Sequence, residues 1–431
     1  MKFLYKENCG ITERKLESLG KTLFPYIDHI LACRESGRYE FSESFINLPT
    51  DKVLVEEVID LVKEKKTNAL KYIFLIGIGG SNLGVKALYE AMYEFSHHTP
   101  KIFFLDTINS QLLEKARIFI DKTLKNPDEC LVVVITKSGK TTETVVNAEI
   151  IFSALAKKFG KNKTYEQMVV ITDDGSSLWK EAKEKKISTL SIPKIITGRT
   201  SVFSSVGLFP MSIVGLGDIE FFLKKIEEMR DCSLSKDIFK NPALLSALVT
   251  YCHIIDGKTI TNTFFFNREL ESIGKWYAQL IAESVGKRHT SNGITERIGI
   301  TPTTSIGSTD LHSVLQLYID GPQDKLTTFV WFDGKESEKI PQETEFNLVP
   351  AIKGKTSTEV ITAIYEATKQ AYKKEKLPFM EVVMEDISDL GVFMQFKMME
   401  VIYLAKLLNV NPFNQPAVEY YKKETRRLLE E

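Results

Sequence analysis

The residues whose types and spacing suggest chemistry begin with a glycine-rich stretch, GIGGSNLG, at 77–84. It follows an apolar run at 72–78 that predicts a buried strand, and apolar residues at helical spacing come after it. A strand, a glycine-rich turn and a helix in that order direct backbone N–H groups and a positive dipole end at the space over the turn. The predicted ligand is an anion, with phosphate first. A tight turn without a ligand is the alternative, but three glycines and a serine exceed what such a turn needs.

A second turn of this kind follows the apolar strand predicted at 130–135, where the chain continues as TKSGKTTET. Gly139, Lys140 and Thr141 look like the end of a P-loop, but the first glycine of that motif would have to be Val134. The turn instead gathers hydroxyl groups that can donate to a phosphate, those of Thr136, Ser138, Thr141 and Thr142. Thr141 can alternatively act only as a helix cap. Two such turns on neighbouring strands favour phosphate binding.

The glycines of the first turn also fit part of a dinucleotide-binding fingerprint, which wants Gly-x-Gly-x-x-Gly and an acid after the next strand. Gly77 and Gly79 fit, but the third glycine position is Asn82. Asp106, at the end of KIFFLD, can imitate the ribose-binding acid. This is a weak sign of an oxidoreductase, and the hydroxyl-rich second turn argues against it.

Candidate proton-transfer residues lie in the second half of the chain. In SIGKWYAQLIAESVGK, Gln279 and Glu283 are four residues apart and share one helix face. Glu283 is either a buried general base or a solvated helix residue, and spacing alone favours the second interpretation. His312 lies in STDLHSVLQLYIDGP, where a preceding polar residue can cap a helix that carries the histidine in its first turn. His289 is another histidine close to Glu283 in sequence.

Two further segments offer charged side chains. Arg199 follows Gly198 in a short polar segment between a predicted strand and helix, where a guanidinium can be aimed into a cleft or simply lie on the surface. Near the C-terminus, Gln415, Glu419 and Lys422 fall along roughly one face of a charged helix, which is normally just solvated.

Alternating strands and helices are needed to position these residues. The first block of predicted strands covers 72–78, 101–106, 130–135, 168–172 and 187–192, and its helices cover 82–95, 110–122, 141–158 and 177–185. The second block has strands at 258–265, 298–302, 327–332 and 379–384, and helices at 242–255, 270–285, 310–319, 357–373 and 390–408. Such alternation predicts an α/β fold with doubly wound parallel sheets and ligands at the carboxyl ends of the strands.

Composition narrows the class of protein. The 431 residues hold 56 Lys+Arg against 57 Asp+Glu, so no basic field indicates nucleic acid or an anionic membrane as a partner. Five scattered cysteines without CxxC spacing indicate free thiols in a reducing compartment. Without a signal-peptide core or a membrane-length apolar run, we expect a cytoplasmic protein. No grouping has the spacing of metal ligands, so we expect no metal.

Taken together and in order, six segments resemble those of the glucose-6-phosphate isomerase family, in its shorter bacterial form. The resemblance covers roughly residues 70 to 425 and rests on GIGGSNLG, TKSGKTTET, GRTSVFSSVGL, QLIAESVGK, TDLHSVLQLYIDGP and NPFNQPAVEYYK. It implies two sugar-isomerase α/β/α sandwich domains and a C-terminal helical arm, in a homodimer. The expected division is an N-terminal helical segment at 1–70, a first domain at 71–215, a second at 216–405 and the arm at 406–431.

The resemblance also implies a role for each candidate. Glu283 would be the base that moves a proton between C2 and C1 of the sugar, and Gln279 would help to hold the substrate. Arg199 would stabilise the enediolate, while His312 and Lys422 would assist ring opening. Gln415 would close over the 6-phosphate. The residues implied around the substrate in the first domain are Gly80, Ser81, Thr136, Lys137, Ser138, Thr141 and Gly198.

The implied chemistry is an aldose–ketose shift, which needs one carboxylate beside two carbons and a cation for the oxygens, and no cofactor. Three positions depart from the family pattern: Thr136 replaces a serine, Lys140 a small or hydroxylated residue, and Ala417 a common glycine. The alternatives are a non-catalytic sugar-phosphate regulator of the same fold and the dinucleotide-dependent oxidoreductase. The joint presence of Glu283, His312 and Arg199 speaks against the regulator. Mannose 6-phosphate stays open as a further substrate.

Overall fold

The computed structural model describes residues 1–93, 96–97, 100–332, 337–346 and 348–431. The chain forms two compact units, unit 1 (Met1–Asp28 and Glu228–Glu431) and unit 2 (His29–Glu227). It passes from one unit to the other within α2 (Phe24–Ser36) and α10 (Ile219–Cys232). The predicted division at 1–70 differs from these units, because Met1–Asp28 groups with the second half of the chain.

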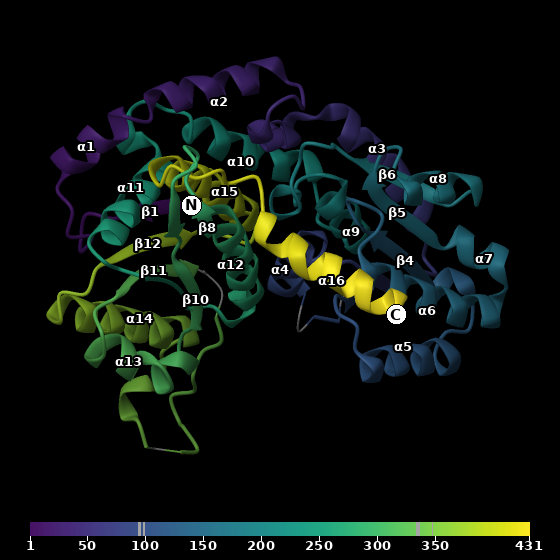
Figure 1. Ribbon diagram of the computed structural model, residues 1–431. Coiled ribbons are helices and arrows are strands. Elements are labelled where there is room, and N and C mark those ends of the chain that lie inside the picture. The colour runs from purple at the N-terminus through teal and green to yellow at the C-terminus, as the bar shows by residue number, and fades with distance from the viewer. Residues whose placement is uncertain (94–95, 98–99, 333–336, 347) are drawn as a thin grey trace. The chain divides into compact units, whose positions relative to one another are not determined.

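Unit 2 is built on a parallel sheet that, in the described part of the chain, has five strands in the order β3-β2-β4-β5-β6 (Figure 1). The strands are β2 (Tyr72–Ile76), β3 (Lys101–Leu105), β4 (Cys130–Ile135), β5 (Met168–Asp173) and β6 (Ser188–Ile192). Its α-helices are α3 (Lys52–Lys65), α4 (Leu83–Tyr93), α5 (Ser110–Lys122), α6 (Thr142–Phe159), α7 (Lys161–Glu166), α8 (Ser177–Glu184) and α9 (Ser205–Val214). Short 3-10 helices are η1 (Ser42–Thr50), η2 (Gly79–Ser81), η3 (Pro127–Glu129) and η4 (Gly198–Thr200).

The central strands of unit 2 are buried on both faces, as parallel sheets require. In β4 every residue is buried. Phe74, Val132 and Val170 point to one side, where they pack with Ile120 of α5 and Ile151 of α6. The alternating residues face the other side. The strong apolar runs of the sequence therefore predicted these strands correctly.

Unit 1 also contains a five-stranded sheet, in which the strands of the described residues have the order β1-β12-β11-β7-β10. Its strands are β1 (Lys2–Leu4), β7 (Ile260–Phe265), β10 (Thr301–Ile306), β11 (Lys325–Phe332) and β12 (Phe379–Met384), with a separate hairpin of β8 (Lys287–His289) and β9 (Thr295–Ile298). The α-helices are α1 (Glu13–Lys21), α11 (Pro242–Ile255), α12 (Glu271–Val285), α13 (Leu315–Asp320), α14 (Ser357–Lys374), α15 (Asp389–Leu407) and α16 (Glu419–Glu430). The 3-10 helices are η5 (Ile238–Lys240), η6 (Arg268–Leu270), η7 (Thr309–His312), η8 (Pro350–Ile352) and η9 (Pro416–Val418).

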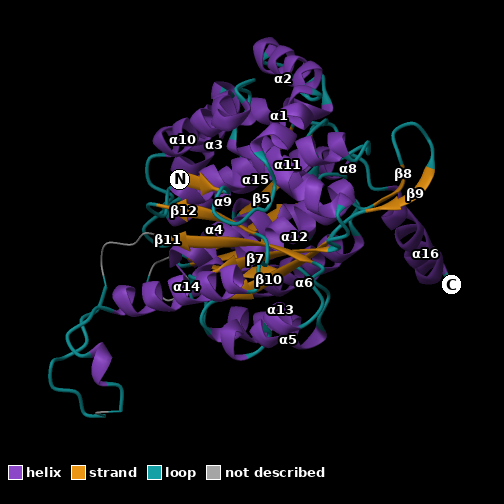
Figure 2. Ribbon diagram, turned by 90° about the vertical axis from the view of Figure 1, so that its left-hand side faces the viewer, coloured by secondary structure: helices purple, strands orange, loops and turns teal. Residues whose placement is uncertain are grey.

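Two helical layers cover this second sheet (Figures 1 and 2). On one face, Phe329 and neighbouring aromatic residues pack with Tyr318 of α13 and Tyr365 of α14. On the other, Phe265 contacts Phe393 of α15, with ring centroids 6.2 Å apart. The expected α/β fold with doubly wound parallel sheets is confirmed, and β1 adds an antiparallel edge strand that the sequence did not indicate.

Several predicted elements were wrong in detail. The strand expected at 298–302 is divided, because the hairpin β8–β9 ends at Ile298 and β10 begins only at Thr301. The helix expected at 310–319 is a 3-10 turn followed by the shorter α13. The end of the helix expected at 82–95 includes residues 94 and 95, which lie outside the described residues.

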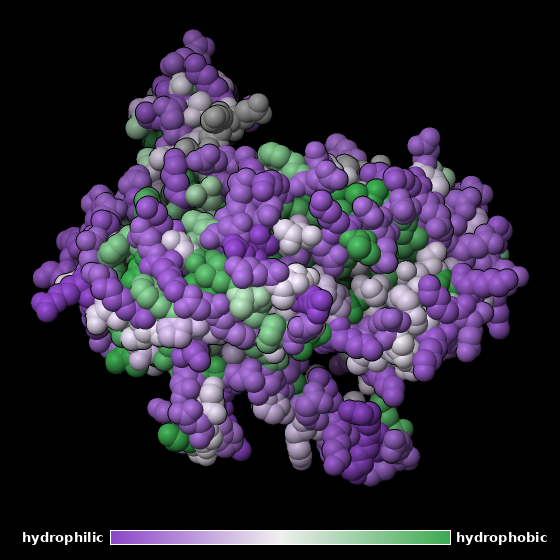
Figure 3. Space-filling view, turned by 90° about the horizontal axis from the view of Figure 1, so that it is seen from above, coloured by the Kyte–Doolittle hydropathy of each residue, from purple (hydrophilic) through white to green (hydrophobic). Residues whose placement is uncertain are grey.

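The face seen in Figure 3 is largely hydrophilic, with hydrophobic residues in scattered groups. Among the described residues, none of the helices combines the length and apolarity needed to span a membrane.

Candidate functional site

The first phosphate-type turn of unit 2 forms where predicted, between β2 and α4. The chain turns through η2, where Ser81 N–H donates to the Ile78 carbonyl over 3.2 Å. Gly80 comes so close to η4 that a Cβ there would collide with the Gly198 carbonyl group. Only glycine permits this approach. The two segments are therefore held together through their backbones.

The segment η4 carries Arg199, whose side chain is buried rather than on the surface, since the residue is 3% exposed. Its neighbours hold the turn: Ser201 Oγ donates to the Gly198 carbonyl over 2.7 Å, and the Thr197 and Thr200 hydroxyl oxygens are 3.0 Å apart. A buried guanidinium held beside a glycine-rich turn is suited to an anionic ligand.

The second turn, between β4 and α6, is held by its own hydroxyl groups. Thr136 Oγ1 and Thr141 Oγ1 are 3.0 Å apart, and Lys140 N–H donates to Ser138 Oγ over 3.2 Å. Thr141 occupies the N-cap position of α6, yet its side chain makes no capping hydrogen bond to the described residues. The backbone N–H groups in the first turn of α6 therefore have no hydrogen bond to the Thr141 hydroxyl.

Lys137 lies at the centre of this second turn. Its carbonyl accepts hydrogen bonds from Thr172 Oγ1 and Asp173 N–H, each over 3.2 Å, which ties the turn to the end of β5. Burial lowers the pKa of the Lys137 ammonium, and the Asp173 carboxylate opposes that effect. Burial likewise raises the pKa of Asp173, against the two lysines near it. A dianionic ligand would stabilise the charged form of Lys137.

Sheet topology places both turns at the same edge. The chain leaves β2 for β3 on one side and then returns to β4 on the other side of β2. The carboxyl ends of β2 and β4 therefore flank a topological switch point, where ligands of open α/β sheets bind. The structure brings the two predicted phosphate turns of unit 2 to that point.

In unit 1, α12 presents the predicted amide and carboxylate as a pair. Gln279 Nε2 donates to Glu283 Oε1 over 3.0 Å. Gln279 Oε1 is buried without a hydrogen-bond partner among the residues described. A substrate hydroxyl can supply the missing donor. Glu283 is partly buried, which excludes the interpretation that it is a fully solvated helix residue.

Lys287 is a residue that the sequence analysis did not single out as functional. Its Nζ donates to the Glu283 carbonyl over 2.5 Å and to the Asn414 carbonyl over 2.6 Å. It thus joins the end of α12 to the residue before Gln415. The available signal was its spacing of four residues from Glu283, which aligns a lysine with an exposed carbonyl at a helix end.

His312 is the last residue of the 3-10 turn η7 and is exposed, rather than lying in the first turn of a longer helix. Asp310 does not cap that helix, because its carboxylate accepts from Ile306 N–H over 2.7 Å and Ser313 Oγ over 2.8 Å. The turn is therefore fixed directly to the carboxyl end of β10.

Glu283 and His312 lie toward opposite ends of the pair formed by α12 and β10 in unit 1. A Cβ at Gly274, in the first turn of α12, would collide with Thr304 in the second half of β10. At the other end, the Cβ position of Gly299 is 3.3 Å from Gly286 Cα, just before β10 begins. The helix thus runs antiparallel to β10. At 1.5 Å per residue, Glu283 is about 13 Å along α12 from Gly274, toward the end away from η7.

The C-terminal candidates lie in η9 and α16. Gln415 is the partly buried residue before η9. Lys422 forms an ion pair with Glu419, with Nζ 2.8 Å from Oε1. This interaction lowers the pKa of Glu419.

Asp106, the candidate ribose-binding acid of the oxidoreductase alternative, is already engaged within the protein. Asp106 Oδ2 accepts a hydrogen bond from Asn82 Nδ2 over 2.8 Å, and Lys86 Nζ is 3.8 Å from the same oxygen. Asp106 thus serves to hold the residue that replaces the third glycine of the dinucleotide fingerprint.

A profile of the phosphoglucose isomerase family matches residues 51–431. The chain belongs to this family. It is 34% identical over 382 residues to the glucose-6-phosphate isomerase of Methanocaldococcus jannaschii, covering 88% of this chain and 89% of the relative. It is 31% identical over 441 residues to that of Carboxydothermus hydrogenoformans, covering 99% and 92%. The resemblance inferred from the six segments is confirmed.

Solved structures show the same fold as this member of the phosphoglucose isomerase family. A hypothetical protein from Thermus thermophilus superposes with a TM-score of 0.86 at 25% identity, over 99% of both chains. A glucose-6-phosphate isomerase from Chlamydia trachomatis superposes with a TM-score of 0.81 at 20% identity, over 97% of this chain and 86% of the other.

Proposed function

We propose that this protein is an aldose–ketose isomerase that interconverts glucose 6-phosphate and fructose 6-phosphate, a step of glycolysis and gluconeogenesis. The observation that carries the proposal is the Gln279–Glu283 pair on α12, in a chain that belongs to the phosphoglucose isomerase family. The curated relatives named above, both glucose-6-phosphate isomerases, support the choice of substrate.

In the proposed reaction, Glu283 removes the proton from C2 of the open-chain sugar and returns it to C1 through an enediolate. Gln279 orients the carboxylate through Nε2 and binds a sugar hydroxyl through Oε1. Arg199 stabilises the negative charge that develops on the enediolate oxygens. His312 and Lys422 move protons during ring opening. Reaction by proton transfer alone needs no cofactor.

The two turns of unit 2 bind the 6-phosphate. The hydroxyls of Ser81, Thr136, Ser138 and Thr141 donate to it, Lys137 supplies a cation, and Gly80 and Gly198 allow the backbone to approach. Gln415 closes over the bound group. Phosphate binding remote from the reacting carbons provides energy for orientation.

The active enzyme is proposed to be a homodimer in which His312 reaches the site of the partner chain. The antiparallel course of α12 and β10 supports this, because it separates Glu283 and His312 within one chain. We also propose the cytoplasm as its compartment, in keeping with the free state of Cys9, Cys33, Cys130, Cys232 and Cys252.

A coupled assay of fructose 6-phosphate conversion tests the proposal, with mannose 6-phosphate in parallel and each substrate measured with and without a chelator. Glucose 6-phosphate should form reversibly and at the same rate with chelator. Binding of sugar phosphates without turnover would instead indicate the regulator. Activity that disappears on chelation and returns with a divalent ion would contradict the metal-free reaction.

A further inference from the structure

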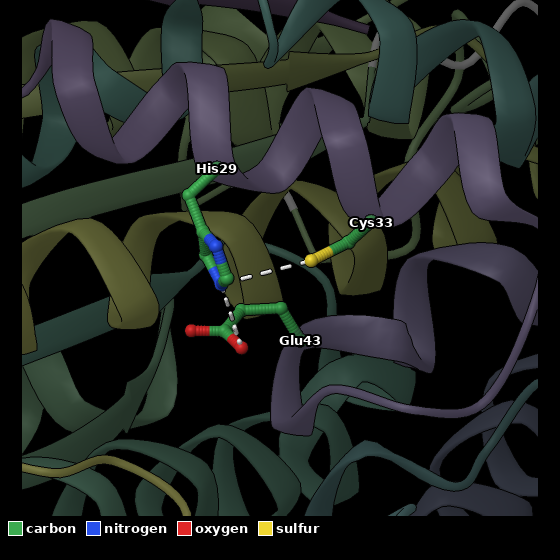
Figure 4. Close-up of side chains that lie close together, drawn as sticks. All are labelled: His29, Cys33 and Glu43. Atoms are coloured by element: carbon green, nitrogen blue, oxygen red, sulfur yellow. Dashed lines mark hydrogen bonds and ion pairs between the residues drawn. The ribbon is translucent and has the colours of Figure 1, made fainter.

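Three potential metal ligands, none of which has a role in the proposed reaction, lie together in unit 2 (Figure 4). They are His29, Cys33 and Glu43. His29 Nε2 is 3.6 Å from Cys33 Sγ and 3.4 Å from Glu43 Oε2. The ligand atoms of the three residues all lie within 4.8 Å of one another. In the described part of the chain, no other group of three or more His, Cys, Asp or Glu residues is arranged in this way.

Local structure sets the three side chains in place. His29 and Cys33 are four residues apart on α2 and therefore project from one face of the helix. Glu43 lies in the first turn of η1. Asn47 Nδ2, also in η1, donates to the Cys33 carbonyl over 3.1 Å and so ties η1 to α2. The ring of Phe41 meets the His29 imidazole edge-on, with centroids 5.4 Å apart, which restricts its orientation.

Two of the three donor-atom separations, both measured from His29 Nε2, fit tetrahedral coordination, and the third, between Cys33 Sγ and the Glu43 carboxylate, lies within 4.8 Å. With metal bonds of about 2.3 Å to sulfur, about 2.0 Å to nitrogen and about 2.1 Å to oxygen, the S···N edge of a tetrahedron is about 3.5 Å and the N···O edge about 3.3 Å. Each edge lies within about 0.1 Å of the corresponding distance from His29 Nε2 to Cys33 Sγ or Glu43 Oε2. A thiolate, an imidazole and a carboxylate together suit Zn²⁺ and disfavour Mg²⁺ and Ca²⁺, which prefer oxygen ligands only.

We propose that His29, Cys33 and Glu43 bind one Zn²⁺ ion per chain, with water as the fourth ligand. The ion joins α2 to η1 and takes no part in the proposed isomerase reaction. Entry from solvent is open, because 41% of the His29 side-chain surface is exposed.

Cobalt titration of the full-length, chelator-stripped protein tests the proposal, because Co²⁺ replaces Zn²⁺ in such sites and its bond to a thiolate gives a charge-transfer band. The wild type should bind one equivalent of Co²⁺, show the band, and lose it to one equivalent of Zn²⁺. Cys33→Ser should abolish the band. His29→Gln and Glu43→Gln should weaken Co²⁺ binding at least tenfold.

Two matched variants serve as controls. Cys232→Ser removes an exposed cysteine and His97→Gln an exposed histidine, and both should retain the wild-type titration. Circular dichroism checks folding. If Cys33→Ser does not fold, His29→Gln decides, because the His29 side chain is 41% exposed whereas Cys33 is fully buried. A band that survives Cys33→Ser, unchanged binding in His29→Gln, or no stoichiometric binding by the wild type would overturn the proposal. Isomerase turnover is measured separately and should not change with Zn²⁺, so the two proposals fail independently.

Discussion

At the scale of single residues, the unsatisfied oxygen of Gln279 is informative. Buried polar atoms are nearly always hydrogen-bonded, and those that are not commonly await a ligand or water. Gln279 commits its Nε2 to Glu283, so its Oε1 is left as an acceptor beside the proposed base. That arrangement can hold a sugar hydroxyl next to the carboxylate that acts on the adjacent carbon.

Glu283→Gln should retain the fold and substrate binding but lose turnover, because an amide cannot accept the C2 proton. Removal of a general base typically lowers the rate by about two to four orders of magnitude. Exchange of solvent tritium into C2 should fall with turnover, while affinity for a non-reacting sugar phosphate should persist. Near-normal turnover in this variant would move the role to another residue, and His289 would be tested first.

Phosphate binding should weaken at alkaline pH, where Lys137 loses its positive charge. Because its pKa is lowered from the ordinary value of about 10.4, the ammonium is fully charged below the lowered pKa and becomes neutral as pH rises through it. Affinity for a non-reacting sugar phosphate should then fall about tenfold or more, since a hydrogen bond to a charged group contributes about 1.5–3 kcal/mol.

Lys137→Arg is the control for this titration, because arginine keeps its charge throughout the range. Its dissociation constant should be insensitive to pH where that of the wild type rises. If the alkaline loss of affinity persists in the arginine variant, another group is responsible.

Residue types alone indicated much of the candidate site, but not how each side chain is used. The glycine-rich turn was predictable, whereas the need for glycine at Gly80 comes from Gly198, more than a hundred residues away in sequence. Glu283 and Lys287, like His29 and Cys33, are four residues apart, and the expectation of no metal did not consider the second pair. The third partners, Asn414 and Glu43, come from separate segments. Contacts between distant segments depend on tertiary packing, which spacing does not encode.

At the scale of elements, buried parallel strands were the most predictable. β4 and β12 have the predicted bounds, because β4 is an apolar run between Glu129 and Thr136, and β12 lies between Pro378 and Glu385. The hairpin β8–β9 was missed, since its sequence is polar and its strands have exposed residues. The edge strand β1 was also missed, because three residues carry too little pattern, and its place beside β12 is a tertiary effect.

Gly80→Ala should separate η2 from η4 and destabilise unit 2. The added methyl group would meet backbone atoms, which cannot turn aside as a flexible side chain can. Overpacking of this kind costs about 1–3 kcal/mol. Gly198→Ala is the matched control for stability, because its Cβ would be 3.6 Å from Gly80 Cα, an ordinary contact. Urea unfolding of the two variants and the wild type measures the effect. Equal stability of the two variants would contradict the steric argument.

A buried ion pair on α15 offers a second test at this scale. Lys397 Nζ is 2.7 Å from Glu400 Oε2, and both side chains are 1% exposed. Ser246 Oγ donates to the same carboxylate over 2.7 Å, and Tyr277 Oη, on α12, over 3.4 Å. The pair therefore links α15 to the helix that carries Gln279 and Glu283.

Lys397→Met should destabilise the protein by about 3–5 kcal/mol, because it leaves the Glu400 carboxylate buried without its cation. Adding Glu400→Gln removes that charge while keeping an acceptor for Ser246 and Tyr277. The double variant should recover much of the loss in urea unfolding. A double variant less stable than Lys397→Met would show that the carboxylate is not the source of the destabilisation.

At the scale of the whole molecule, the course of α12 against β10 bears on how many chains make a working site. Glu283 and His312 lie toward opposite ends of the same helix–strand pair. A base that isomerises the open-chain sugar and a residue that assists the opening of its ring must both come within hydrogen-bond reach of the same bound molecule. One way to satisfy both conditions is for the two residues to come from different copies of the chain, and a two-fold dimer then contains two equivalent sites.

Mixed dimers test this arrangement directly. Glu283→Gln and His312→Ala homodimers should each be nearly inactive, since every site carries one lesion. When the two are unfolded and refolded together, random pairing makes about half of the dimers mixed, and a shared site puts both lesions into one site and leaves the other intact. Activity should then return to roughly a quarter of that of refolded wild type. If both residues act within one chain, every site keeps a lesion and mixing restores nothing, which would reject the shared site while leaving the isomerase assignment in place.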